Sequence, residues 1–486
     1  ISFESSLTYE IEKMLKLMSM ENIIKKISST ANFGDKRLNN RLEKTIGKLT
    51  KEIKAPITTA SGDKASVKGS YRFFSNQKVN STKIIDAHIK SLYPYLSNNQ
   101  TPTRILQLSD TTEFDYTGKK GAKDLGVLNY PNRKGIYSHS SLLVSDLGVP
   151  IGVFKQTHWS RDVSYLGQSA ARRSLPLKDK ESYRWYDHFE AGEQLCRQMP
   201  NLEWVYVADR EADFMELLVA RTCERMHYVI RSQYDRNLSG QEDKLRAQLS
   251  KQEVKHTYEI EIAHPQTKKK RKVQLAVKYC PVTLELCRRH PSGYVIPPTK
   301  INAIEVREVD PPQDITEPIY WILLTTLPVS TPQQACLVIQ YYVWRWLIER
   351  FFYLLKTGGA NVEKLQLKTQ QRLENAISTY SIAAMNVMKM KYLAENQPDT
   401  PINELGITSQ EHEALYTILH HKYSKKIVFD PQLIPTIREY CIALGMLGGF
   451  YPSKRQPLPG LKVLTRAFDK YHLLIDFFTI TRMSKN

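Results

Sequence analysis

TRILQLSD, residues 103–110, is a short apolar run that ends in a carboxylate. Its isoleucine and leucines predict a buried strand, with Asp110 at the end of that strand. The same pattern returns in LEWVYVAD, residues 202–209, which ends at Asp209. One acid at a strand end is more often a cap or turn residue than a functional group. A functional role for either aspartate therefore depends on other acids that could act with it.

Other segments extend this pattern along the chain. The order strand, hairpin, helix, strand, helix, strand, β-rich segment, strand and helix is typical of an α/β core. Lysine-rich helices precede this core over residues 8–92, and helical patterns follow it from about residue 361. The predicted core elements after Asp110 are a hairpin in 138–159, a helix in 183–198, the strand 202–209, a helix in 210–224, the strand 226–232, polar β-like runs in 233–317 and the strand 320–326.

Charge is the unusual property of the composition. The chain has 486 residues, with 69 Lys and Arg against 50 Asp and Glu, a net charge of +19. This surplus indicates a polyanionic partner, with nucleic acid favoured over a membrane surface. No apolar run approaches the roughly twenty residues of a membrane span, and the first residues show no secretion signal. Six scattered cysteines without a CxxC pair suit a reducing cytoplasm.

The stretch YYVWRWLIERFFYLLK, residues 341–356, predicts a helix with one apolar face. At about 100° per residue, Tyr342, Arg345, Glu349 and Lys356 fall on a narrow polar stripe opposite that face. The ordinary interpretation of such a stripe is a solvated surface with a weak pair between Arg345 and Glu349. A role for Glu349 therefore depends on other carboxylates that could meet it.

Asp110, Asp209 and Glu349 come from three elements and together match what two-metal phosphoryl transfer requires. Carboxylate oxygens are hard ligands that Mg²⁺ accepts while it keeps waters and substrate phosphate. Two ions about 4 Å apart activate the attacking oxygen and stabilise the leaving oxygen. Clustered carboxylates without cations would repel one another, so this set of acids is reasonable mainly around metal ions.

Three segments of the chain resemble the three acidic motifs of the DDE transposases of the IS-four family, the Tn-five type. They are LSDTTEFDY (108–116), VADREADF (207–214) and YVWRWLIERFFYLLK (342–356). The third segment contains the family's Y-x2-R-x3-E-x6-K signature as Tyr342, Arg345, Glu349 and Lys356. FGDKR (33–37), GSYRF (69–73), YWILLTT (320–326) and LGGFYPSKR (447–455) are also similar to this family, so the resemblance runs over nearly the whole chain.

The resemblance implies an α/β fold with a ribonuclease-H-like mixed-sheet core and three domains. Residues 1–83 would form an all-helical domain that binds the transposon end. Residues 84–392 would form the catalytic domain, with an inserted antiparallel β subdomain at about 233–317. Residues 393–486 would form an all-helical C-terminal domain for dimerisation.

The resemblance also implies roles for eight residues. The metal ligands would be Asp110, Asp209 and Glu349, and the DNA-contacting residues would be Tyr342, Arg345, Lys356, Trp321 and Arg231. The ligands would hold two Mg²⁺ ions, with Mn²⁺ as a substitute. Trp321 would stack on a base flipped out of the duplex, although composition alone favours a core position for a tryptophan in such a strand.

We therefore expect a homodimeric bacterial cut-and-paste transposase that acts on double-stranded DNA at transposon ends and targets. It would cleave through a hairpin intermediate, and we expect it in the cytoplasm, associated with the nucleoid, with no membrane partner. Two alternatives remain open. One is a catalytically silent DNA-binding regulator or inhibitor of transposition, and the other is a structure-selective nuclease with the same ribonuclease-H-like core.

Overall fold

The computed structural model of the chain describes residues 20–97, 104–119, 124–168, 175–263, 270–285, 296–423 and 433–483. Contacts divide the chain into two compact units. The first unit takes the residues up to Ile105, the segment Thr111–Ser174 and everything from Leu347 onward. The second unit takes Leu106–Asp110 and Leu175–Trp346. Strand β1 (Arg104–Asp115) therefore contributes residues to both.

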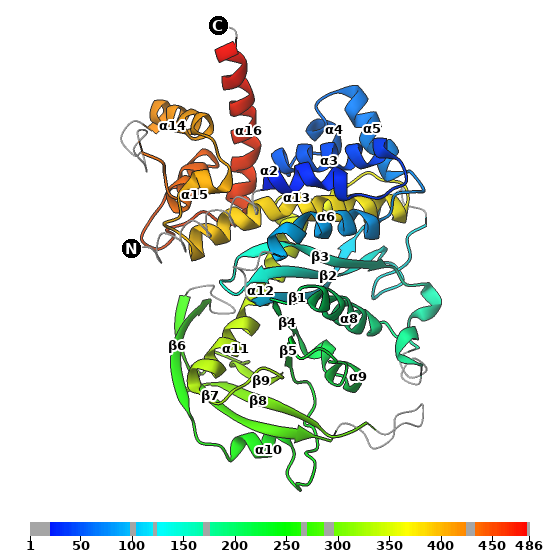
Figure 1. The fold of residues 1–486 in the computed structure, drawn as a ribbon, viewed down its shortest axis with the longest axis vertical. Helices are drawn as coiled ribbons and strands as arrows, with labels where there is room; N and C mark the ends of the chain where they lie inside the picture. Colours follow the sequence, from blue (N-terminus) through cyan, green and yellow to red (C-terminus); the bar gives the residue numbers. More distant parts are fainter. Residues whose placement is uncertain are drawn as a thin grey trace. The chain divides into compact units, whose positions relative to one another are not determined.

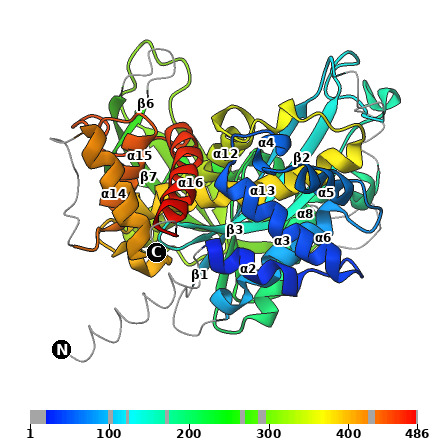
Figure 2. The ribbon, with the colours of Figure 1, turned by 90° about the horizontal axis from the view of Figure 1, so that it is seen from above.

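The described part of the first unit begins with helices, as the lysine-rich pattern predicts. Asp35 and Asp63 act as N-caps because their carboxylates accept the amides of Arg37 and Ser66. Gly34 separates α2 (Met20–Thr30) from α3 (Lys36–Lys51) with a φ of +71°, which glycine adopts without strain. Helix α2 packs against α3 and α6, and these lie together in Figure 2. The helices are α2 (Met20–Thr30), α3 (Lys36–Lys51), α4 (Ile57–Ala60), α5 (Lys64–Phe74) and α6 (Ser81–Leu96).

The predicted hairpin is confirmed in the same unit. Strands β2 (Gly135–Ser145) and β3 (Pro150–Trp159) pair antiparallel, and β2 is buried along its whole length. Helices α6 and α13 (Gln370–Asn396) pack on β3, and Figure 1 shows both beside that strand. The remaining helices are α12 (Trp346–Tyr353), which begins at the unit boundary, α14 (Ser409–Tyr423), α15 (Ile437–Leu447) and α16 (Leu461–Met483).

The second unit is built on a mixed sheet. Its strand order is β1-β4-β5-β9-β8-β7-β6, where β4 and β5 are parallel and β5 and β9 are antiparallel. The described residues of the β-rich segment in 233–317 supply three antiparallel strands that continue this sheet beyond β9. The strands are β4 (Glu203–Ala208), β5 (Met226–Arg231), β6 (His256–Ala263), β7 (Lys270–Leu284), β8 (Thr299–Glu308) and β9 (Tyr320–Thr325).

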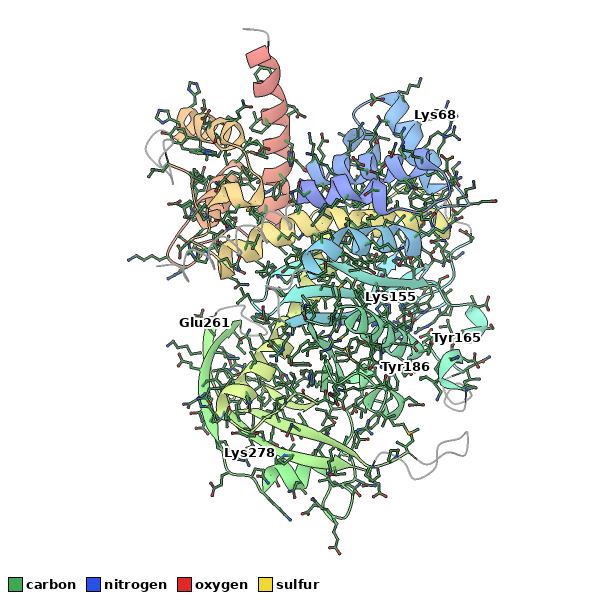
Figure 3. The ribbon with its side chains drawn as sticks, viewed as in Figure 1. Lys68, Lys155, Tyr165, Tyr186, Glu261 and Lys278 are labelled. Atoms are coloured by element: carbon green, nitrogen blue, oxygen red, sulfur yellow. The ribbon has the colours of Figure 1, made fainter. Side chains whose placement is uncertain are left out.

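Four α-helices lie in the described residues of the second unit. Lys278 of β7, labelled in Figure 3, donates to the Ser250 carbonyl oxygen at 2.9 Å and so connects β7 to the end of α10. Within the described ranges, no helix combines the length and apolar character that a membrane crossing needs. The helices are α8 (Tyr183–Gln198), α9 (Met215–Leu218), α10 (Leu245–Ser250) and α11 (Pro332–Trp344).

Candidate active site

Asp110 lies within strand β1 and not at its end. The strand continues to Asp115, because the β-branched Thr111 and Thr112 favour extended backbone and Phe114 is fully buried. The prediction that a strand stops at Asp110 is therefore wrong. Gln107, on the same strand, accepts a hydrogen bond from the Trp204 indole at 2.8 Å and donates to the His188 carbonyl at 2.8 Å. These bonds hold the β1 segment of the second unit against β4 and α8.

Asp209 directly follows β4, as predicted, and begins a 3₁₀ turn (Arg210–Ala212). Its carboxylate accepts the Glu211 amide at 2.9 Å and caps that turn. The helix expected over 210–224 is wrong, since this segment contains only the 3₁₀ turn and the single turn of α9. The physical reason lies in Asp213, whose buried carboxylate pairs with Arg236 and holds the backbone between the two turns.

The negative charges of Asp110 and Asp209 both affect the phenol of Tyr206. Burial raises the pKa of Tyr206, and the negative charges of Asp209 and Asp110 raise that pKa further, with a smaller effect than burial. β1 and β4 are adjacent strands of the sheet. The two carboxylates therefore belong to one region of the second unit.

Arg345 interrupts the helix predicted over 341–356. α11 ends at Trp344 and α12 begins at Trp346, while the Arg345 amide donates to the Tyr342 carbonyl three residues back at 3.1 Å. The guanidinium Nη1 of Arg345 donates to Oδ2 of Asp110 at 2.7 Å. The ordinary interpretation as a solvated stripe is therefore wrong at two positions, because the residues Tyr342 and Arg345 are only 3% and 7% exposed.

Tyr342 is the centre of a group of aromatic and cationic side chains. Its ring lies 5.2 Å from the Trp321 ring in an edge-to-face arrangement, and the Arg345 guanidinium carbon is 5.8 Å from the Tyr342 ring centre. Burial raises the pKa of the Tyr342 hydroxyl, while the positive charges of Arg345 and Arg231 oppose this rise and Asp209 adds to it. We define the tyrosine-centred cluster as Asp110, Asp209, Arg231, Trp321, Tyr342 and Arg345, all in the second unit.

Trp321 and Arg231 stand on neighbouring strands, β9 and β5. Trp321 is half-buried, unlike Ile322, Leu323 and Leu324 that follow it in the core. Arg231 is also half-buried, and its Nη2 donates to the Tyr320 carbonyl at 3.3 Å. Both side chains thus retain access to solvent beside Tyr342.

Glu349 and Lys356 belong to the first unit. Glu349 is exposed in the first turn of α12, and Lys356 lies in a π-helical turn (Leu354–Gly358) that replaces the predicted end of the helix. Burial lowers the pKa of Lys356, and the negative charge of Glu363 partly offsets this. Over the ranges that the structure describes, no three acidic, histidine or cysteine side chains form a group that could hold a metal ion.

The donors of the second unit nevertheless fit a divalent metal chemically. Asp110 and Asp209 offer carboxylate oxygens, the hard ligands that Mg²⁺ prefers. Oδ2 of Asp110 accepts a hydrogen bond from the Arg345 guanidinium, so a metal ion at that oxygen would share it with Arg345 or replace it. These two residues are therefore suitable ligands for such an ion.

Exposed cations cover the N-terminal helices. The sequence predicts a basic helical module but does not show which of its residues contact a partner. The high density of lysine is the only signal for such contacts. Lys68 on α5 is one such residue and is labelled in Figure 3. The exposed basic residues between α2 and the residues that follow α5 are Lys25, Lys36, Arg37, Lys44, Lys51, Lys54, Lys64, Lys68, Arg72 and Lys78.

Comparison with known protein families gives two matches. Residues 20–79, which hold α2 to α5, match the family described as Transposase DNA-binding. Residues 188–386 match the family described as Transposase DDE domain. The second match contains Asp209, Arg231, Trp321, Tyr342 and Arg345 of the tyrosine-centred cluster, together with Glu349 and Lys356.

Proposed function

The chain is a DDE transposase, since it carries a transposase DNA-binding domain and a DDE transposase domain, and we propose that it is a cut-and-paste enzyme of the Tn-five type. A DDE domain implies a ribonuclease-H-like fold and a metal-dependent enzyme that cleaves DNA. The mixed sheet of the second unit agrees with that fold class. The observation that supports the finer proposal is the tyrosine-centred cluster, which combines carboxylates, cations and aromatic rings beside one another.

We propose Asp110, Asp209 and Glu349 as ligands of two Mg²⁺ ions, with Mn²⁺ able to replace them. When bound, the metal ions lower the barrier to attack at phosphorus and stabilise the charge of the leaving oxygen. The three carboxylates would hold and orient the two metal ions. Arg345 reaches Asp110 directly, and Glu349 follows Arg345 by four residues in the sequence, which supports a shared role for these motif residues.

The cationic residues hold the DNA backbone in this proposal. Arg345 and Lys356 neutralise phosphates next to the scissile bond. The Tyr342 hydroxyl donates a hydrogen bond to a phosphate oxygen. A phenol with a raised pKa stays protonated at neutral pH and therefore remains a donor. Arg231 holds the phosphates around a nucleotide that is extruded from the duplex. The base of that nucleotide stacks on the half-buried ring of Trp321.

The reaction sequence consists of four in-line displacements at phosphorus. Water attacks first, which leaves a 3′-hydroxyl at the transposon end. That hydroxyl attacks the opposite strand and forms a hairpin, and a second water opens the hairpin. The 3′-hydroxyl ends then attack target DNA. We propose that a homodimer performs these steps on the bacterial nucleoid, and that each subunit binds one end and cuts the other.

The test is a cleavage assay on linear DNA that carries the inverted repeats found in the DNA flanking the gene. In Mg²⁺ the wild-type chain should nick the repeat and then form hairpins. Ala variants of Asp110, Asp209 and Glu349 should bind the repeat but fail to cut it, because these carboxylates hold metal and not DNA. Glu317→Ala, which removes an exposed carboxylate of the second unit, is the matched control and should cut normally.

Three results would contradict parts of the proposal. Normal cleavage by Glu349→Ala would remove Glu349 from the metal site. Specific binding without any cleavage by the wild-type chain would identify a silent regulator or inhibitor. Cleavage that follows DNA structure and ignores the repeat sequence would identify a structure-selective nuclease.

A further inference from the structure

Tyr234 is an exposed aromatic residue on the loop that follows strand β5. It is 54% exposed, although a tyrosine ring is a large apolar surface. The loop, residues 232–236, comes directly after Arg231, which is a member of the tyrosine-centred cluster. An exposed aromatic ring next to a nucleic-acid site indicates a contact surface if the backbone holds the ring in place.

Asp213 fixes this loop. One oxygen of its fully buried carboxylate accepts the amides of Gln233 at 2.7 Å and Tyr234 at 3.2 Å, and the Ser232 hydroxyl at 3.2 Å. The other oxygen accepts Nε of Arg236 at 3.0 Å. Charge-assisted hydrogen bonds are about twice as strong as neutral ones. A single carboxylate thus fixes Ser232, Gln233, Arg236 and the backbone of Tyr234 itself.

The same loop is joined to the strand that carries Trp321. The Ser232 amide donates to the Ile322 carbonyl at 2.7 Å, immediately after Trp321 in the sequence. Arg231 pairs in register with Leu323 on that strand. Tyr234 is therefore three residues from Arg231 in the chain, and Ser232, two residues before Tyr234, is bonded to the residue that follows Trp321.

Arg236 supports the Tyr234 ring. Its guanidinium carbon lies 5.4 Å from the ring centre, within the range of a cation–π contact. The Arg236 side chain is only 10% exposed, and its charge is already paired with Asp213. Arg236 therefore holds the Tyr234 ring against the loop that Asp213 fixes.

We infer that Tyr234 stacks on an unpaired base of the DNA held by Arg231 and Trp321, and that Asp213 is the positioning residue for this contact. The inference rests on the proposed function of those two residues. A preordered ring loses little conformational entropy on binding, so most of the stacking energy contributes to affinity. Tyr234 would serve as a second aromatic surface beside Trp321, where strand separation leaves bases unstacked.

The test measures equilibrium binding of the full chain in EDTA, so that no strand is cut. The probes are a short duplex with a single-stranded tail and the same duplex fully paired. Tyr234→Ala should weaken binding to the tailed duplex by about 5- to 150-fold, the equivalent of one lost base stack. Binding to the paired duplex should change less than twofold, and the salt slope should not change, since stacking releases no counterions.

Two conservative variants distinguish stacking from other contacts. Tyr234→Phe keeps the ring and should bind like the wild type, whereas Tyr234→Leu keeps bulk without a flat ring and should behave like Tyr234→Ala. If Tyr234→Phe loses as much affinity as Tyr234→Ala, the hydroxyl contacts a phosphate and the stacking inference is overturned. Equal binding of the tailed probe by wild type and Tyr234→Ala overturns it as well.

The positioning role of Asp213 is tested in two backgrounds, the wild type and Tyr234→Ala. Asp213→Asn should weaken tailed-duplex binding in the wild-type background and have no further effect in the Tyr234→Ala background. A similar loss in both backgrounds, or a loss of fold, would show that Asp213 acts on the whole unit. If the wild-type chain never cuts DNA but Tyr234→Ala still loses tail affinity, the transposition proposal fails and the stacking contact remains. Normal cutting together with normal tail binding by Tyr234→Ala removes only the stacking contact.

Discussion

Nη1 of Arg345 donates to Oδ2 of Asp110 at 2.7 Å, across 235 positions of sequence. The two side chains are only 9% and 19% exposed, so the pair is largely shielded from water. The loss of one partner from a shielded pair is costly, because it leaves the other charge without compensation. The pair therefore connects the stability of the second unit to the residues proposed to hold metal and DNA.

This pair should show energetic coupling in the absence of metal. Arg345→Met and Asp110→Asn should each lower the free energy of unfolding by about 3 kcal/mol in EDTA. The double variant should lose clearly less than the sum of the two, as urea denaturation would measure. Additive losses would show that the two side chains do not depend on each other.

Arg345 and Lys356 should each neutralise about one phosphate. Replacing either with Ala should weaken DNA binding at all sequences and reduce the slope of log K against log salt by about 0.9 per phosphate. Lys278→Ala is the matched control, because its ammonium group is bound to the Ser250 carbonyl oxygen. An unchanged slope in the double Arg345→Ala/Lys356→Ala variant would remove both residues from the phosphate contacts.

Trp321 should act after the first nick. Trp321→Ala should nick at a normal rate and form hairpins slowly, while Trp321→Phe should be intermediate, since stacking on an aromatic ring contributes about 1–3 kcal/mol per base. An abasic site at the flipped position should partly rescue Trp321→Ala, because less stacking then has to be broken. Gel analysis of nicked and hairpin products provides the measurement. Equal slowing of both steps, or loss of fold, would assign Trp321 to the core.

The C-terminal region should mediate assembly. Leu473 and Phe477 on α16 are 69% and 66% exposed, an unusual position for large apolar side chains on a helix. The Leu473→Ser/Phe477→Ser variant should bind single ends but fail to form a paired-end complex, as gel mobility would show.

Cleavage between subunits can be tested with two defective full-length chains. One is Glu349→Ala, and the other carries Lys64→Ala, Lys68→Ala and Arg72→Ala on α5, which removes exposed cations of the end-binding domain. A mixture of the two should restore some cutting, whereas each alone should be inactive. If no mixture cuts, each subunit cuts the end that it binds.

Lys389 should make stability depend on pH. Burial within the helices of the first unit lowers the pKa of Lys389 from 10.5 to about 7. Above pH 7 the unfolded chain then holds a proton that the folded chain lacks, so stability rises from pH 7 toward 9. This contribution is at most about 1.4 kcal/mol per pH unit.

The measurement is the difference in free energy of unfolding between the wild-type chain and Lys389→Met across that pH range. The wild type should gain stability relative to the variant as the pH rises. Lys391→Met is the control, because Lys391 pairs with Glu395 at 2.6 Å. A pH-independent difference for Lys389→Met would mean that Lys389 keeps its charge in the folded chain.

The sequence alone predicted the elements whose patterns are local. The hairpin of β2 and β3, the strands β4, β5 and β9, and the N-terminal helices all follow from the alternation of apolar residues, from apolar runs and from capping residues. Asp209 stands after β4 as predicted, and the charge surplus agrees with the DNA-binding family match. These features depend on residues close together in the chain, so a linear pattern contains them.

Only the tertiary structure decided where Asp110 and Arg345 lie and what surrounds Tyr342. A helical pattern places Arg345 on a solvated stripe, whereas its partner is a carboxylate 235 residues away, and the helix breaks at the residue that makes this bond. Asp213 likewise prevents the helix expected in 210–224 by bonding a loop after the next strand. Local periodicity measures how apolar a helix or strand face is, but a polar side chain is buried when a distant partner satisfies its hydrogen bonds.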